Sequence, residues 1–130
     1  MTLAITGIYA AILGIMFVAL RVNVIIERAK SGISIMHGDN MALAEKIRKF
    51  GNFIEVVPHA LILLAITEAF GASSIWLHII GGTLIASRIL HPIGLDHTNG
   101  KNPIRIVSGM LTSISFVVAI VFILWSSFSG

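Results

Sequence analysis

The stretch RKFGNFIEVVPHALILLAI, residues 48–66, is a long apolar segment interrupted by a few strongly polar side chains. Four of these are Arg48, Asn52, Glu55 and His59. At about 100° per residue in an α-helix, the four positions fall within a sector of about 60°. A carboxylate and a guanidinium in such surroundings cost several kcal/mol unless other groups offset them. The polar stripe therefore predicts a functional site within a membrane helix.

The composition of the whole chain is that of a membrane protein. Of its 130 residues, 56% are hydrophobic and 12% are charged, and the mean hydropathy is +0.96. Soluble globular domains carry about 25% charged residues, so a soluble domain is excluded. Without cysteine, the protein supplies no disulfide and no thiolate of its own. The net charge of +3 comes with no separate basic patch, and we predict no nucleic-acid partner.

The apolar segments predict an all-α fold, a bundle of four transmembrane helices in one domain, residues 1–130. The predicted spans are about 3–26, 41–70, 74–91 and 104–128. No basic residue precedes the first span, so we expect it to be retained rather than cleaved as a signal peptide.

Particular residues predict where these helices begin and end. Asp39 or Asn40 is expected to cap the second helix, and Gly71 to end it. We expect the dipeptide His91-Pro92 to close the third span, because proline disfavours helix at the residue before it. Pro103 suits the first turn of the fourth helix.

The basic residues predict the orientation in the membrane. Lys and Arg cluster around the first and third loops, whereas the second loop and both tails have none. By the positive-inside rule, both termini face away from the cytoplasm. At least one cation from every span then lies at one membrane level, which suits a small polyanionic ligand. These cations are Arg21, Arg28, Arg48, Arg88 and Arg105.

The same polar residues also admit structural roles. Arg48 and Glu55 can pair with neighbouring helices and hold a bundle together. Arg88 can extend to the membrane surface, and His91 can cap a helix end. The histidines show no HxxH or HExxH spacing, so we predict no metal site.

The segment RKFGNFIEVVP, residues 48–58, resembles the second-helix signature of the MAPEG family, the membrane-associated proteins in eicosanoid and glutathione metabolism. That signature, R-x-x-x-N-x-x-E-x-x-P, is matched by Arg48, Asn52, Glu55 and Pro58. The segment RILHPIG, residues 88–94, is similar to the end of the third helix in bacterial members. The number, length and orientation of the predicted spans also fit, so the resemblance covers the whole chain.

The resemblance implies a homotrimer, in the inner membrane of a bacterium, that binds glutathione as cosubstrate between subunits near the cytoplasmic face. It implies a function like that of microsomal glutathione S-transferases: transfer of the thiolate to lipophilic electrophiles, or reduction of lipid hydroperoxides. The implied contacts to glutathione are Arg48, Asn52 and Glu55, with Arg88, His91 and Arg105 as further contacts and Arg28 added from the ring of cations.

The chemistry of glutathione agrees with these residues. Glu55 can pair with its ammonium, and the arginines can bind its two carboxylates. In many members of the family a tyrosine follows the glutamate, but here Val56 follows Glu55 and the only tyrosine is Tyr9. We therefore expect Arg105 to be the catalytic residue that stabilises the thiolate.

Two other functions are alternatives. A small proton-coupled multidrug exporter could use Glu55 as its exchanging carboxylate, although the surrounding arginines would repel cationic drugs. A haem-bearing membrane anchor would need two facing imidazoles, and His59 and His78 lie at different predicted depths.

Overall fold

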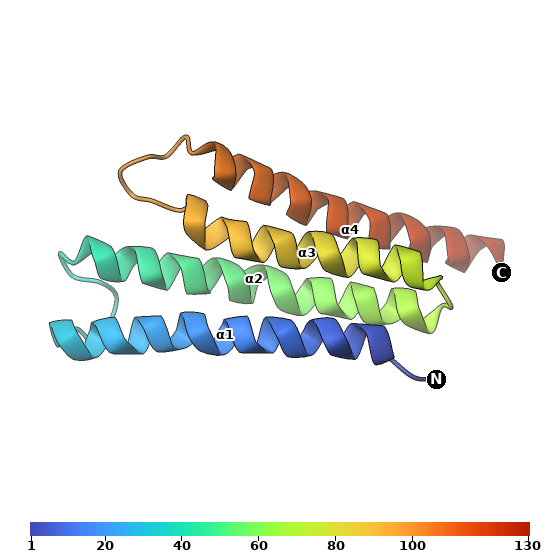
Figure 1. The fold of residues 1–130 in the computed structure, drawn as a ribbon, viewed down its shortest axis with the longest axis horizontal. Coiled ribbons are helices and arrows are strands. Elements are labelled where there is room, and N and C mark those ends of the chain that lie inside the picture. The colour runs from blue at the N-terminus through green and yellow to red at the C-terminus, as the bar shows by residue number, and fades with distance from the viewer.

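The computed structural model describes all 130 residues and contains four long helices. They are α1 (Ala4–Ser31), α2 (Met41–Ala69), α3 (Ser74–Gly94) and α4 (Pro103–Ser129). The helices lie side by side with their long axes roughly aligned (Figure 1). The closest packing is between α1 and α2 and between α3 and α4, and α2 also contacts α3 and α4. The predicted all-α, four-helix fold is confirmed.

The two ends of the bundle differ in what they contain. The loops 32–40 and 95–102 lie at one end, here called the basic end because Lys and Arg cluster around it (Figure 1). Both termini and the short α2–α3 connection lie at the opposite end, here called the terminal end (Figure 1). The bundle therefore brings the cations from all four helices toward one level.

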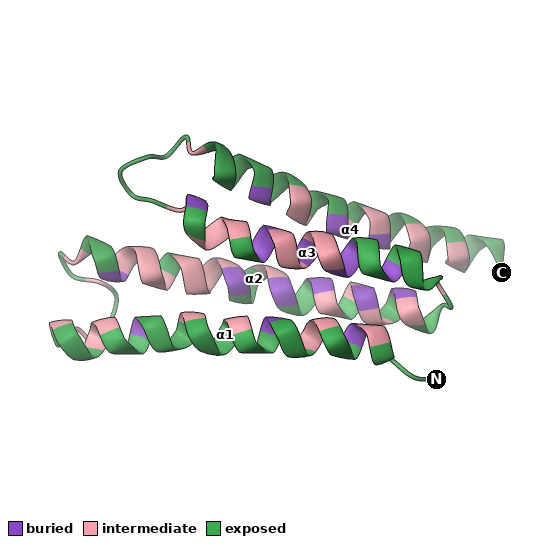
Figure 2. Cartoon of the chain, in the orientation of Figure 1, coloured by how far each residue is buried: buried purple, intermediate pink, exposed green.

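The outer surface of the bundle suits a lipid environment. Helices α1, α2 and α4 are long and apolar enough to cross a membrane. Helix α3 has 21 residues, which is about 31 Å at 1.5 Å per residue, and it carries Arg88 and two histidines. Buried residues follow the seams between helices, and exposed residues cover the outside (Figure 2). Many of the exposed residues are large and apolar.

Most of the predicted helix ends are confirmed by local hydrogen bonds. The side chain of Asn40 accepts a hydrogen bond from the Leu43 amide at 3.0 Å and caps α2. Helix α2 ends at Ala69, just before Gly71, whose φ of 81° only glycine adopts freely. Pro103 opens α4 as predicted, behind the cap Asn102.

Two helices run further than predicted. Helix α1 continues to Ser31, where Gly32 takes a left-handed conformation and its amide donates to the Arg28 carbonyl at 2.8 Å. Helix α3 continues through Pro92 to Gly94, so the prediction that His91-Pro92 closes it is wrong. The missing proline N–H removes one bond near the helix end, but the Leu95 amide still donates to the His91 carbonyl at 3.0 Å.

Candidate functional site

The centre of the site is the guanidinium of Arg88, which is 3% exposed. Its Nη1 donates to Oδ1 of Asn52 on α2, and its Nη2 donates to Oγ1 of Thr112 on α4, both at 2.6 Å. Its Nε donates to Oγ of the neighbouring Ser87 at 3.0 Å. All three acceptors are neutral, and no carboxylate forms an ion pair with Arg88. Arg88 is thus a buried cation that joins three helices without a counter-ion from its own chain.

Local structure orients the two hydroxyl acceptors of Arg88. The Ser87 hydroxyl donates to the Leu84 carbonyl at 2.7 Å, and the Thr112 hydroxyl donates to the Ser108 carbonyl at 2.9 Å. A hydroxyl has one proton to donate and two lone pairs that accept. With each proton already committed to its own helix, the lone pairs face the guanidinium.

Arg88 opens into a cleft of about 240 Å³ between α2, α3 and α4, here called the Arg88 cleft. A second cavity of about 300 Å³, here called the junction cavity, lies beside the loop 95–102. Arg105 is the residue that lines both cavities. The Arg88 cleft is lined by Asn52, Val56, Arg88, His91, Arg105, Ser108, Gly109 and Thr112. It contains two arginines and no carboxylate, which favours an anionic ligand.

Arg48 and Glu55, which lie two turns apart on one face of α2, form a bidentate ion pair. Both nitrogen–oxygen distances are 2.9 Å. Their side chains are 54% and 55% exposed, so the pair lies on the outside of the single chain. Neither residue lines the Arg88 cleft, although Arg48 lines the junction cavity. Within one chain, these two predicted site residues are therefore satisfied by each other.

Of the other predicted site residues, His91 and Arg105 come together with Arg88 in the cleft. Arg28 does not line either cavity. Its Nη1 donates to the carbonyls of Ile33 and Met36, at 3.1 Å and 2.9 Å, and so holds the loop 32–40 in place. The structure thus brings together all the predicted arginines of α3 and α4, but not that of α1.

The junction cavity is bordered by a hydrogen-bonded tether between the loop 95–102 and α2. The carboxylate of Glu45 accepts from the His97 amide at 2.7 Å and also contacts Nδ1 of the His97 ring. The amide and hydroxyl of Thr98 donate to Asp96 and hold the pKa of that carboxyl below its usual range. Ligand atoms of Glu45, Asp96 and His97 lie within 4.8 Å of one another. The tether itself accounts for that grouping, and we assign no metal to it.

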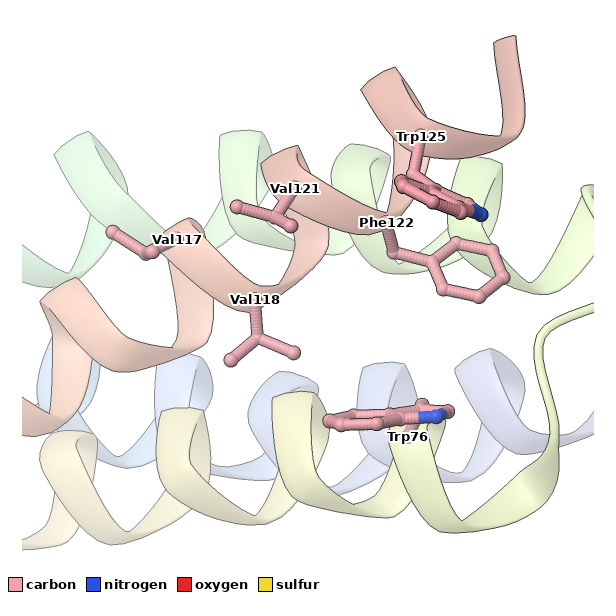
Figure 3. Close-up of a pocket in the computed structure, with 6 residues that line it drawn as sticks. All are labelled: Trp76, Val117, Val118, Val121, Phe122 and Trp125. Atoms are coloured by element: carbon pink, nitrogen blue, oxygen red, sulfur yellow. The ribbon is translucent and has the colours of Figure 1, made fainter. Parts of the chain in front are cut away.

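An apolar groove of about 430 Å³ lies at the terminal end, between α3 and α4. Figure 3 shows the indole rings of Trp76 and Trp125 on its two sides, with Phe122 between them. Its other lining residues are Val117, Val118 and Val121. Tryptophan favours the edge of a membrane, and a groove without charged side chains offers nothing to a polyanion.

The remaining histidines of the membrane helices have separate partners. The ring of His59 packs edge-on against Phe116, with centroids 5.3 Å apart. His78 bonds through Nδ1 to the hydroxyl of Tyr9 at 2.9 Å, near the terminal end. The structure does not bring these two imidazoles together.

Sequence reasoning missed Ser87 and Thr112, which hold the Arg88 guanidinium. A signal for α4 was present, because Ser108, Thr112 and Ser115 repeat at the i, i+4, i+7 spacing of one helix face. Ser108 and Ser115 are buried, and the Ser115 hydroxyl donates to the Ile80 carbonyl on α3 at 2.9 Å. The helical spacing of polar residues, which indicates the polar stripe of α2, indicates this second stripe on α4 as well.

Comparison with known proteins identifies the family. The model of the MAPEG family matches residues 6–125 of the chain. The chain belongs to the MAPEG family. The inner membrane protein YecN of Escherichia coli strain K12 is 28% identical over 93 residues, which cover 72% of this chain and 71% of YecN. YecN of Escherichia coli O6:H1 matches to the same extent, and no solved structure matches.

Membership of the MAPEG family confirms the resemblance inferred from the second-helix signature. The match of the family model includes that signature and both cavities of the basic end. The family is associated with glutathione and eicosanoid metabolism.

Proposed function

We propose that this MAPEG protein binds glutathione at the basic end of its bundle. We further propose that it transfers the glutathione thiolate to lipophilic electrophiles or reduces lipid hydroperoxides. The observation that carries the proposal is the guanidinium of Arg88, 3% exposed and without an anionic partner. A buried unpaired charge is costly, and a bound carboxylate would offset that cost.

The other polar groups complement the rest of glutathione. Arg88 supplies a cation for one of its two carboxylates, and the Arg48–Glu55 pair offers both signs of charge. Glu55 can exchange Arg48 for the ligand's ammonium, which leaves Arg48 free for a carboxylate. Since arginine binds carboxylates through two parallel hydrogen bonds, this exchange keeps both side chains paired.

Arg105 is our candidate for stabilising the thiolate. It is exposed in the wall shared by the two cavities, and its guanidinium makes no hydrogen bond or ion pair within the chain. A free thiol with a pKa near ~8.5 is only a few per cent ionised at neutral pH. Lowering that pKa by about 2 units requires about 2.7 kcal/mol of preferential stabilisation of the thiolate. A nearby guanidinium supplies an effect of that size where water is excluded, so we propose that the bound ligand and a neighbouring subunit cover the exposed Arg105.

The exposed Arg48–Glu55 pair supports association with a further subunit, and we propose the homotrimer that the resemblance to the family implies. An ion pair on the outer surface of a membrane helix is unfavourable against lipid and needs protein or water around it. A neighbouring subunit packed on α2 would supply both cover and further ligand contacts.

We also propose an inner-membrane location with both termini outside the cytoplasm, in line with the name of YecN and the distribution of Lys and Arg.

The alternative functions receive less support from the geometry. A proton-coupled exporter must admit cationic drugs, whereas the Arg88 cleft is lined by two arginines and no carboxylate, which disfavours a cation. A bis-histidine haem site would need facing imidazoles, and His59 and His78 contact Phe116 and Tyr9 instead.

The proposal is tested by calorimetric titration of the detergent-solubilised protein with glutathione. We expect binding in the wild type and a loss of roughly 10- to 150-fold in affinity in Arg88→Gln, from one lost charge-assisted contact of about 1.5–3 kcal/mol. Lys101→Ala is the matched control, because Lys101 is exposed at the same end and lines neither cavity. Absence of binding in the folded wild type, or equal affinity in Arg88→Gln, would contradict the proposal.

A further inference from the structure

The end of α3 and the start of α4 approach each other so closely that only glycine fits between them. A Cβ atom on Gly94 would lie 2.5 Å from the backbone nitrogen of Arg105 and 3.0 Å from its Cα. Carbon atoms in ordinary contact are about 3.5–4 Å apart, so a methyl group here would push the two segments apart by about 1 Å. Gly94 is buried, and the obstacle is backbone, which cannot rotate away as a side chain can.

A second contact holds the same junction from the other side. The loop 95–102 between Gly94 and α4 is tethered to α2, because the His97 amide donates to Glu45 at 2.7 Å and Nδ1 of the His97 ring contacts the same carboxylate. The loop then enters α4 through Asn102, whose side chain accepts from the Ile104 amide at 2.9 Å. The first turn of α4 is therefore located by contacts with both α3 and α2.

Arg105 lies in that first turn and lines both the Arg88 cleft and the junction cavity. We propose that Gly94 and His97 are positioning residues that act through Arg105. Their contacts fix the backbone from which the Arg105 side chain extends. The consequence for a bound thiol rests on the proposed glutathione site, whereas the placement of Arg105 does not.

The expected effect on the ligand follows from Coulomb's law. Moving a cation from about 4 Å to about 5 Å from a thiolate weakens their attraction by about a fifth. In a partly hydrated site this raises the pKa of the bound thiol by about half a unit. Gly94→Ala and His97→Ala are both expected to produce a rise of this kind, since the first forces α3 and α4 apart and the second removes the ring's part of the tether to Glu45.

The placement itself can be tested without any ligand. The chain has no cysteine, so Arg105→Cys provides a single thiol whose alkylation rate reports its surroundings. We expect Gly94→Ala to change that rate by roughly threefold or more, because the burial and charge around a thiol set its reactivity. Gly82→Ala is the control, since Gly82 lies on α3 with open space around its Cβ position. A thiol placed at Ser129, at the terminal end, should react at the same rate in both backgrounds.

The glutathione complex provides the second test, read from the near-ultraviolet absorbance of the thiolate. Gly94→Ala is expected to raise the pKa of the bound thiol, and to have no further effect in an Arg105→Ala background. Equal thiol pKa values in Gly94→Ala and Gly82→Ala, with equal alkylation rates at position 105, would overturn the proposal. If Gly94→Ala does not fold, the same two measurements on His97→Ala decide. If the wild type binds no glutathione, the proposed function fails and the alkylation rates alone decide the positioning role.

Discussion

The replacement Thr112→Val tests whether Arg88 depends on its neutral partners. Valine keeps the shape of threonine but cannot accept the hydrogen bond that Arg88 Nη2 donates at 2.6 Å. Hydrogen bonds from a charged group contribute about 1.5–3 kcal/mol, and here the loss leaves a guanidinium N–H unpaired in a side chain that is 3% exposed. The lost bond to the Ser108 carbonyl adds little, because backbone atoms of α4 already satisfy that oxygen. We therefore expect the free energy of unfolding to fall by about 1.5–3 kcal/mol.

The matched control for this replacement is Ser113→Ala. Ser113 is the next residue on α4, and its exposed hydroxyl donates only to the Gly109 carbonyl of its own helix, at 3.1 Å. Its loss should change stability by no more than about 0.5 kcal/mol. Both variants can be compared by reversible unfolding in mixed detergent micelles, followed by circular dichroism. If Thr112→Val is as stable as Ser113→Ala, then the Arg88–Thr112 bond does not hold α3 against α4, and our reasoning about the site is refuted.

Three further predictions concern the ligand and the membrane. Glu55→Gln keeps the shape of the side chain and removes its charge, so glutathione affinity measured by calorimetry should fall roughly 10- to 150-fold; unchanged affinity with a loss of drug efflux would favour the exporter. Arg105→Ala should raise the pKa of the bound thiol toward about 8.5, measured by thiolate absorbance. A thiol pKa that stays low would move the role to Arg88 or His91, the other cleft residues that can carry a positive charge. A reporter fused to the C-terminus should report an extracytoplasmic location, and a cytoplasmic signal would reverse the proposed orientation.

The sequence by itself determined the helices, most of their ends and the family. Hydropathy located four segments, and single residues with a local role, such as the cap Asn40 and the opening Pro103, marked their limits correctly. The signature of α2 identified the MAPEG family through Arg48, Asn52 and Glu55, because a helical period places these residues on one face. These features depend on neighbours within a few residues along the chain, so they can be inferred without knowing the fold.

Only the tertiary structure decided which polar groups meet. Arg88 binds Asn52 and Thr112, which lie 36 and 24 residues away in the chain, and the rotation of three helices about their axes determines that choice. The same rotation leaves the Arg48–Glu55 pair outside the Arg88 cleft. At the end of α1, Arg28 donates to carbonyls of the loop that follows it and does not reach the cleft. The role of Gly94 could not be inferred from the sequence either. Glycine is needed there because the backbone of Arg105 occupies the space that a Cβ atom would take. Periodicity describes one helix face at a time, whereas contact energies between helices depend on distances that only packing sets.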